Sequence, residues 1–126
     1  MSTKETINIE LPAVAPRDSW CERLLTNALA ATRERGITYT EHDRLEVDVL
    51  VYLTGRELER TDVDNLLAEV LNGLQGQVGG QGKKIMHPDP RVLWNDRQVW
   101  KATVQKVERP AGVPEEIGGR VTISPA

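Results

Sequence analysis

The sequence is poor in the residues that build metal clusters and disulfide frameworks. Its 126 residues include one cysteine, Cys21, and two histidines, His42 and His87. A single cysteine excludes a disulfide framework and a zinc site made of cysteines alone, and so few ligands argue against a mixed His/Cys cluster. No run of apolar residues is long enough to cross a bilayer as a helix. The first residues, MSTKETINIE, lack the basic and apolar regions of a signal peptide. We therefore expect no membrane partner and a cytoplasmic protein.

What the sequence does contain is typical of one globular domain. Hydrophobic residues make up 39% and charged residues 28%, so we expect residues 1–126 to fold as a single domain. The net charge of −3 is unevenly spread, because residues 83–109 carry seven basic and three acidic side chains, a net of +4. This balance excludes a basic surface over the whole protein and allows a local contact with nucleic acid.

Hydrophobic periodicity predicts two helices and four strands. The clearest strand is 44–54, where alternate residues from Leu45 to Leu53 are apolar, and the clearest helix is 63–75, with an apolar stripe from Val63 to Leu74. The other predicted elements are a strand at 6–11, a helix at 17–35 ending at Gly36, and strands at 98–107 and 120–124. The order β-α-β-α-β-β predicts an α/β (α+β) fold with a small mixed β-sheet flanked by helices.

Three acidic residues are candidates for a metal site. Asp62 and Asp64 precede or begin the helix 63–75, and Asp96 precedes the strand 98–107. Carboxylates that converge can bind Mg²⁺, which can activate water and stabilise the leaving oxygen in phosphodiester hydrolysis. A structural interpretation is also open: acidic residues at a helix N-terminus cap free N–H groups, and an aspartate before a strand is often a turn residue.

The segments around these acids resemble the RusA family of Holliday junction resolvases over about residues 44–124. The matching segments are Asp62-Val63-Asp64-Asn65-Leu66, Asn72-Gly73-Leu74, Trp94-Asn95-Asp96-Arg97-Gln98-Val99, Lys106 and the final GGRVTIS. The resemblance implies a homodimeric, Mg²⁺-dependent endodeoxyribonuclease, with Mn²⁺ as a substitute, that acts on four-way junctions or other branched DNA in recombination and repair. It also implies a RusA-like fold and assigns catalysis and metal binding to Asp62, Asp64 and Asp96. A two-fold dimer would match the symmetry of a junction.

The sequence departs from the family pattern at several positions. Ala68 stands where the family has a lysine, and Asn72 and Asn95 stand where it has acidic residues. The Gly-rich stretch at 76–90 is longer than the family's connection. Ala68, Asn72 and Asn95, together with the net charge of −3, favour an alternative function, a RusA-fold DNA-binding protein with lost or weakened cleavage. An unrelated small α/β interaction module is a further alternative.

Basic and aromatic residues near these motifs are candidates for DNA contact. Lys83 or Lys84 could replace the missing lysine, although Gly-rich loop lysines are more often only solvated, and His87 and Asp89 fit an ordinary loop. Trp94 and Trp100 could stack on bases, but we expect Trp100 to pack into the core, on one strand face with Ala102 and Val104. The predicted DNA-binding residues are Arg56, Arg60, Lys83, Lys84, Arg97, Lys101 and Lys106.

Overall fold

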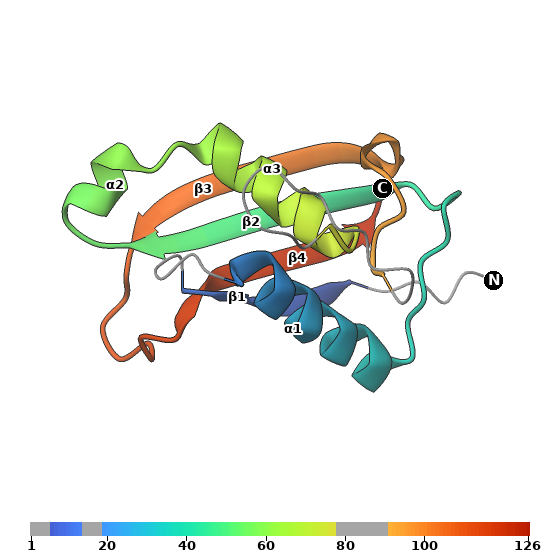
Figure 1. Cartoon of the computed structure of the whole chain (residues 1–126), viewed down its shortest axis with the longest axis horizontal. Coiled ribbons are helices and arrows are strands. Elements are labelled where there is room, and N and C mark those ends of the chain that lie inside the picture. The colour runs from blue at the N-terminus through green and yellow to red at the C-terminus, as the bar shows by residue number, and fades with distance from the viewer. Residues whose placement is uncertain (1–5, 14–18, 78–90) are drawn as a thin grey trace.

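The computed structural model describes residues 6–13, 19–77 and 91–126. Within them, four strands form one mixed sheet that helices cover on one face (Figure 1). The strands are β1 (Ile7–Pro12), β2 (Leu45–Leu53), β3 (Val99–Glu108) and β4 (Ile117–Pro125). The helices are α1 (Trp20–Arg35), α2 (Arg56–Arg60), α3 (Val63–Leu74) and the 3₁₀ turn η1 (Asp96–Gln98). The predicted small mixed sheet flanked by helices is confirmed.

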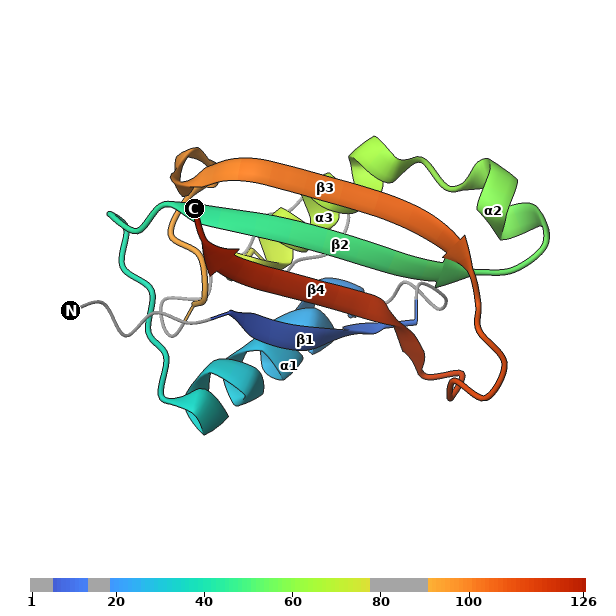
Figure 2. The same cartoon turned by 180° about the vertical axis from the view of Figure 1, so that it is seen from behind.

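The strand order in the sheet is β1-β4-β2-β3. β4 runs antiparallel to both of its neighbours, whereas β2 and β3 are parallel. A parallel pair needs a long crossover connection, and α2 and α3 lie in the segment that connects β2 to β3. Figure 2 shows the sheet from behind, with α1 and α3 beyond it, so the described helices leave this face of the sheet uncovered.

The core lies between the sheet and helices α1 and α3. Every second residue of β2, from Leu45 to Leu53, is buried, as the alternation predicts. Burial of this apolar face contributes about 25 cal/mol for each Å² removed from water. The helices complete the core with Trp20, Leu24 and Ala28 of α1 and Leu66, Val70 and Leu74 of α3.

Two glycines allow close contacts that a side chain would obstruct. A Cβ on Gly73 of α3 would lie 3.3 Å from the backbone oxygen of Cys21 in α1, so the glycine lets the two helices approach each other. Gly119 of β4 has φ 147, and a Cβ there would lie 1.9 Å from the backbone oxygen of Leu50 in β2. These contacts explain why a helix and a strand each carry a glycine that their propensity disfavours.

The exposure of Trp100 differs most clearly from the sequence prediction. We expected it in the core, but it is 63% exposed. The ladder between β2 and β3 shifts register between Leu45, paired with Val99, and Glu46, paired with Lys101, so Trp100 is an extra residue. Such a β-bulge changes the direction in which a side chain points. The prediction that Trp100 shares one strand face with Ala102 and Val104 is therefore wrong.

Smaller differences concern element ends. Arg56–Arg60 forms a helix, α2, that was not among the predicted elements, and β4 begins at Ile117 rather than Arg120. Gly36 ends α1 with φ 65, as expected. Ser19 occupies the N-cap of α1 without a side-chain hydrogen bond. Within the described part of the chain, no helix has the length and apolar character needed to span a membrane.

Candidate functional site

Asp62 occupies the N-cap of α3. One of its carboxylate oxygens accepts a hydrogen bond from the backbone N–H of Asp64 at 3.0 Å, and the other accepts from the side-chain amide of Asn65 at 3.2 Å. The structural interpretation of Asp62 as a cap is thus confirmed. Each carboxylate oxygen has more than one acceptor position, so capping leaves room for a further ligand. Asp64 follows in the first turn, and both acids are exposed.

Lys106 supports the chain just before Asp62. Its ammonium donates to the backbone oxygen of Leu58 in α2 and, at 3.1 Å, to that of Thr61, the residue preceding Asp62. Lys106 comes from β3, where it pairs with the buried Val51, and it is half-buried beneath these carbonyls. We predicted a DNA contact for Lys106, whereas in this structure it ties α2 and the start of α3 to the sheet.

Asp96 lies at the other end of α3. It begins η1, and its carboxylate accepts a hydrogen bond from the side-chain amide of Gln75, the C-cap of α3. The same amide donates to the backbone oxygen of Leu71 at 3.1 Å, so Gln75 has both of its donors satisfied. This buried glutamine therefore fixes the place of Asp96.

The three acids do not meet within one chain. Gln75, the C-cap of α3, follows Asp64 by eleven residues. Because a helix rises by about 1.5 Å per residue, the two residues lie about 16 Å apart along the helix axis. Ligands of a single Mg²⁺ each lie only about 2.1 Å from the ion. The structure therefore brings Asp62 and Asp64 together and keeps Asp96 away from them. Among the described residues, no three acidic, histidine or cysteine side chains are grouped to hold a metal.

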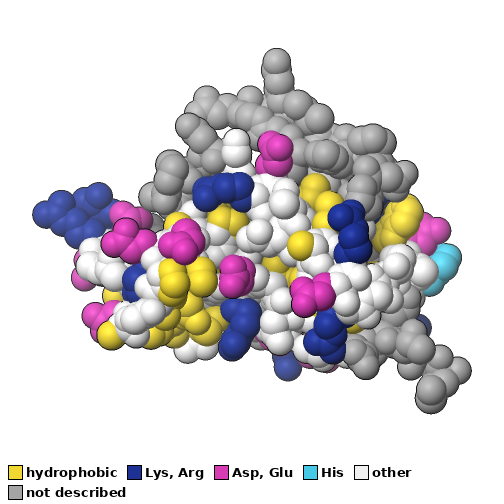
Figure 3. All heavy atoms as spheres, turned by 90° about the horizontal axis from the view of Figure 1, so that it is seen from below, with side chains coloured by type: hydrophobic (Ala, Val, Ile, Leu, Met, Phe, Trp, Pro, Cys, Tyr) yellow, Lys and Arg dark blue, Asp and Glu magenta, His cyan; other side chains and the backbone are white. Residues whose placement is uncertain are grey.

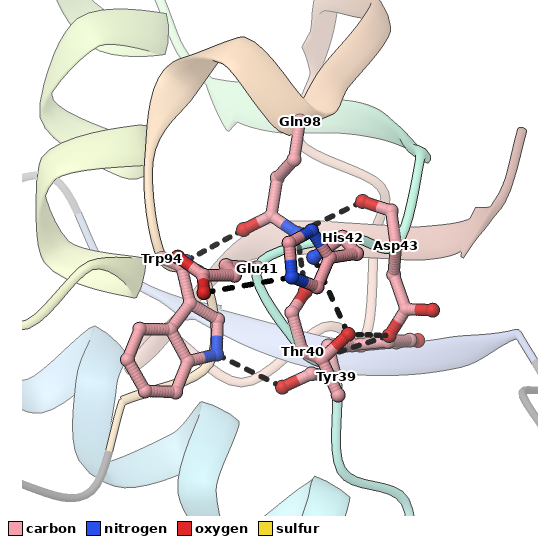
Figure 4. Close-up of polar contacts among 7 residues, drawn as sticks. All are labelled: Tyr39, Thr40, Glu41, His42, Asp43, Trp94 and Gln98. Atoms are coloured by element: carbon pink, nitrogen blue, oxygen red, sulfur yellow. Dashed lines mark hydrogen bonds and ion pairs between the residues drawn. The ribbon is translucent and has the colours of Figure 1, made fainter.

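Gln98 organises the loop beside Asp96 (Figure 4). Its side chain is 4% exposed; the amide donates to the backbone oxygens of Thr40 at 2.8 Å and Asp43 at 2.9 Å, and its oxygen accepts from the backbone N–H of Trp94 at 2.6 Å. The indole N–H of Trp94 donates to the backbone oxygen of Tyr39 at 3.0 Å. The tryptophan and glutamine of the WNDRQ segment thus hold the 39–43 loop against η1. No role was predicted for Gln98 from the sequence, although its spacing from Asn95 is that of a capping box.

The surroundings of Tyr39, in the same loop, raise the pKa of its hydroxyl. Burial, with a smaller contribution from the charge of Asp43, raises the pKa of Tyr39 from 10.0 to about 12. The Asp43 carboxylate accepts from the backbone N–H of Thr40 at 2.7 Å and faces its hydroxyl at 3.3 Å. The loop is therefore held by a connected set of polar contacts.

An open pocket of about 380 Å³ lies between this loop and η1. The guanidinium of Arg44 lies 4.4 Å from the centre of the Trp100 ring. Asn95 and Arg97, on either side of Asp96 in the sequence, contribute to the pocket wall. The pocket is lined by Glu41, His42, Asp43, Arg44, Asn95, Arg97, Gln98 and Trp100.

The other predicted DNA-binding residues are dispersed. Arg56 and Arg60 are exposed on α2, and Lys101 is exposed on β3 with its ammonium 4.0 Å from Glu46. Figure 3 shows basic side chains interspersed with acidic ones on the described part of the face that it presents. Lys83, Lys84, His87 and Asp89 lie outside the described residues.

Comparison with known proteins leaves the family unassigned. No protein-family model matches the chain, and no curated protein sequence matches it. The resemblance to RusA resolvases therefore stays a prediction that rests on the motifs around Asp62, Asp64 and Asp96.

Proposed function

We propose that this protein is a Mg²⁺-dependent endonuclease that cuts four-way junctions or other branched DNA, with each acidic site completed by two copies of the chain. One observation carries the proposal: two exposed carboxylates, Asp62 and Asp64, begin α3, and a third, Asp96, is fixed by Gln75 at its end. Together with the RusA-like motifs, this arrangement favours a shared site over a purely structural set of acids.

A second copy of the chain is needed because, within one chain, Asp96 lies at the far end of α3 from Asp62 and Asp64, about 16 Å away along the helix axis. In a two-fold dimer whose α3 helices pass each other in antiparallel fashion, the start of one helix lies near the end of the other. Asp62 and Asp64 of one protomer then face Asp96 of its partner, and the symmetry makes two equivalent sites. Two such sites would suit a four-way junction, which has two-fold symmetry of its own.

The chemistry of these side chains suits a hard cation. Carboxylate oxygens are the ligands that Mg²⁺ and Mn²⁺ prefer, but of the three candidate acids one chain brings only Asp62 and Asp64 close together. A bound divalent ion would supply charge neutralisation and an activated water. The chain's own contribution is positional: Gln75 orients Asp96, and Lys106 holds Thr61 next to Asp62. Arg56 and Arg60, exposed on the neighbouring α2, offer phosphate contacts that do not depend on base sequence.

A second candidate function is DNA binding without cleavage. Ala68 is exposed one helical turn after Asp64, so both side chains lie on the same side of α3. An alanine there cannot supply the positive charge that a lysine would bring to a phosphate. This substitution favours a protein that holds branched DNA and cuts it weakly or not at all.

Incubation with a labelled four-way junction distinguishes these functions. We expect cutting in Mg²⁺, none in EDTA, and little on a linear duplex of the same sequence. Asp64→Asn, a nearly isosteric change, should abolish cutting and leave the fold intact, whereas the matched control Glu57→Gln on α2 should cut normally. A junction bound but never cut would support the second candidate. Neither binding nor cutting would leave an interaction module as the remaining alternative.

A further inference from the structure

Trp100 is a large apolar side chain that the fold exposes. It is 63% exposed, more than Trp94 at 39%, the other large exposed hydrophobic residue in the described segments. The β-bulge at this point of β3 turns the indole out of the sheet ladder. A large exposed aromatic ring offers a flat face on which another ring can stack.

Two arginines line the pocket together with the indole. Arg44 lies over one face of the ring, at 4.4 Å from its centre, so much of the exposed area belongs to the other face and the ring edge. Arg97 lines the same pocket and makes no ion pair with another residue that the structure describes. Asn95 adds an amide with both donor and acceptor groups.

The acidic side chains of the pocket have partners of their own. Glu41 lies 3.6 Å from the imidazole of His42, and the Asp43 carboxylate accepts from the backbone N–H of Thr40 (Figure 4). The pocket lining thus combines the Trp100 ring and two guanidinium groups with these two carboxylates, which are held by contacts within the 39–43 loop. Stacking surfaces flanked by cations are the means by which proteins bind single-stranded nucleic acid.

We propose that this pocket binds an unpaired nucleobase of a DNA strand, which stacks on Trp100 while its phosphate contacts Arg97. Asn95 and Arg97 flank Asp96 in the sequence, so the pocket adjoins the acid assigned to cleavage. The inference rests on the proposed function, because a branch point offers unpaired or easily unstacked bases beside the phosphate to be cut. The unpaired base is thus the feature of branched DNA that this end of the sheet would recognise.

The test measures binding of a fluorescein-labelled (dA)₈ oligonucleotide by anisotropy in EDTA, where no cleavage occurs. Trp100→Ala should weaken binding about 5- to 150-fold, the range expected for the loss of one stacked base. Trp100→Phe should retain most of the affinity because phenylalanine still stacks. Arg97→Ala should reduce the slope of log K against log salt by about 0.7, the value for one phosphate contact on a single strand.

Tyr52→Leu is the matched control. Tyr52 also has an arginine over its ring, Arg109 at 6.0 Å, but it lies toward the opposite end of β2 from Arg44. We expect wild-type affinity for this variant. Wild-type affinity in Trp100→Ala would overturn the proposal, as would free dAMP that binds as tightly as the oligonucleotide, since the site would then not be built for a strand.

The two proposals fail in different ways. Trp100-dependent binding of the oligonucleotide without junction cutting in Mg²⁺ would contradict the nuclease and support the base-binding pocket. Junction cutting together with oligonucleotide binding that does not depend on Trp100 would support the nuclease and overturn the pocket.

Discussion

Gln75 donates its side-chain amide to the carboxylate of Asp96, and this contact joins the end of α3 to the start of η1. Asp64 lies at the other end of the same helix, in its first turn. The helix therefore acts as a spacer of about 16 Å between acids that the sequence suggests should act together.

Replacing Gln75 with glutamate should make stability depend on pH. Burial and the facing Asp96 carboxylate should raise the pKa of the introduced side chain above its unfolded value of about 4.3. Relative to wild type, the variant should lose least below about pH 4, where the protonated carboxyl keeps one of the two donors, and should lose more stability as pH rises through the raised folded pKa. Urea denaturation at pH 4 and pH 8 measures the difference. Gln75→Leu, which introduces no charge, should show no such trend, and a Gln75→Glu variant equally stable at both pH values would contradict the contact.

Lys106 and Lys101 should respond differently to alanine substitution. Lys106→Ala removes the donors to the backbone oxygens of Leu58 and Thr61, so we expect a loss of about 1–3 kcal/mol in the free energy of unfolding. Lys101 is exposed and its pairing with Glu46 is at the limit of an ion pair, so Lys101→Ala should change stability by less than about 0.5 kcal/mol. Chemical denaturation of the two variants side by side makes the comparison; equal effects would count against the structural role of Lys106.

Gly119→Ala should destabilise the sheet strongly. Its φ of 147 disfavours any side chain, and a Cβ would meet the backbone oxygen of Leu50 at 1.9 Å, so β2 and β4 would have to move apart. We expect a loss of about 3 kcal/mol or more. Gly112 also has a positive φ, 87, but open space around it, so Gly112→Ala should cost only about 1 kcal/mol of backbone strain. Comparable losses at the two positions would contradict the close approach of the strands.

Tyr39 should lose its proton at a higher pH than an ordinary tyrosine, and the free energy of unfolding should therefore fall in alkaline solution. Its pKa of about 12 in the folded state exceeds the 10.0 of an ordinary tyrosine, so the stabilisation is complete below pH 10 and declines as pH rises from 10 to 12. The measurement is absorbance at 295 nm against pH, compared with Tyr39→Phe. The difference between the two curves should have its midpoint near 12, and a midpoint near 10 would show that the side chain is not buried.

The elements with one buried face could be predicted from the sequence. β2 alternates apolar and polar residues because only one face of the sheet meets the helices, and α3 carries its apolar stripe for the same reason. The capping role of Asp62 was also open to prediction, because it depends on residues two and three positions along the chain.

Features set by long-range contacts could not be predicted. The exposure of Trp100 depends on a bulge in the ladder with β2, which a pattern of period two does not reveal. α2 has no buried residue, so its five residues give no periodic signal. The position of Asp96 depends on Gln75, twenty-one residues earlier in the chain, and no local pattern links them. Motif order therefore suggested convergence of the acids, and only the fold showed that Asp96 lies at the far end of the predicted helix.

Mixing two inactive variants tests most directly whether two chains share each acidic site. Asp64→Asn and Asp96→Asn should each fail to cut a four-way junction in Mg²⁺. In a mixed dimer, one site would combine both substitutions, whereas the other would combine the intact Asp62 and Asp64 of one protomer with the intact Asp96 of its partner. We therefore predict that mixing the two purified variants restores cutting, with one site active in each mixed dimer. Mixtures that stay inactive, although the exchange of subunits is shown by mass, would contradict a site shared between chains.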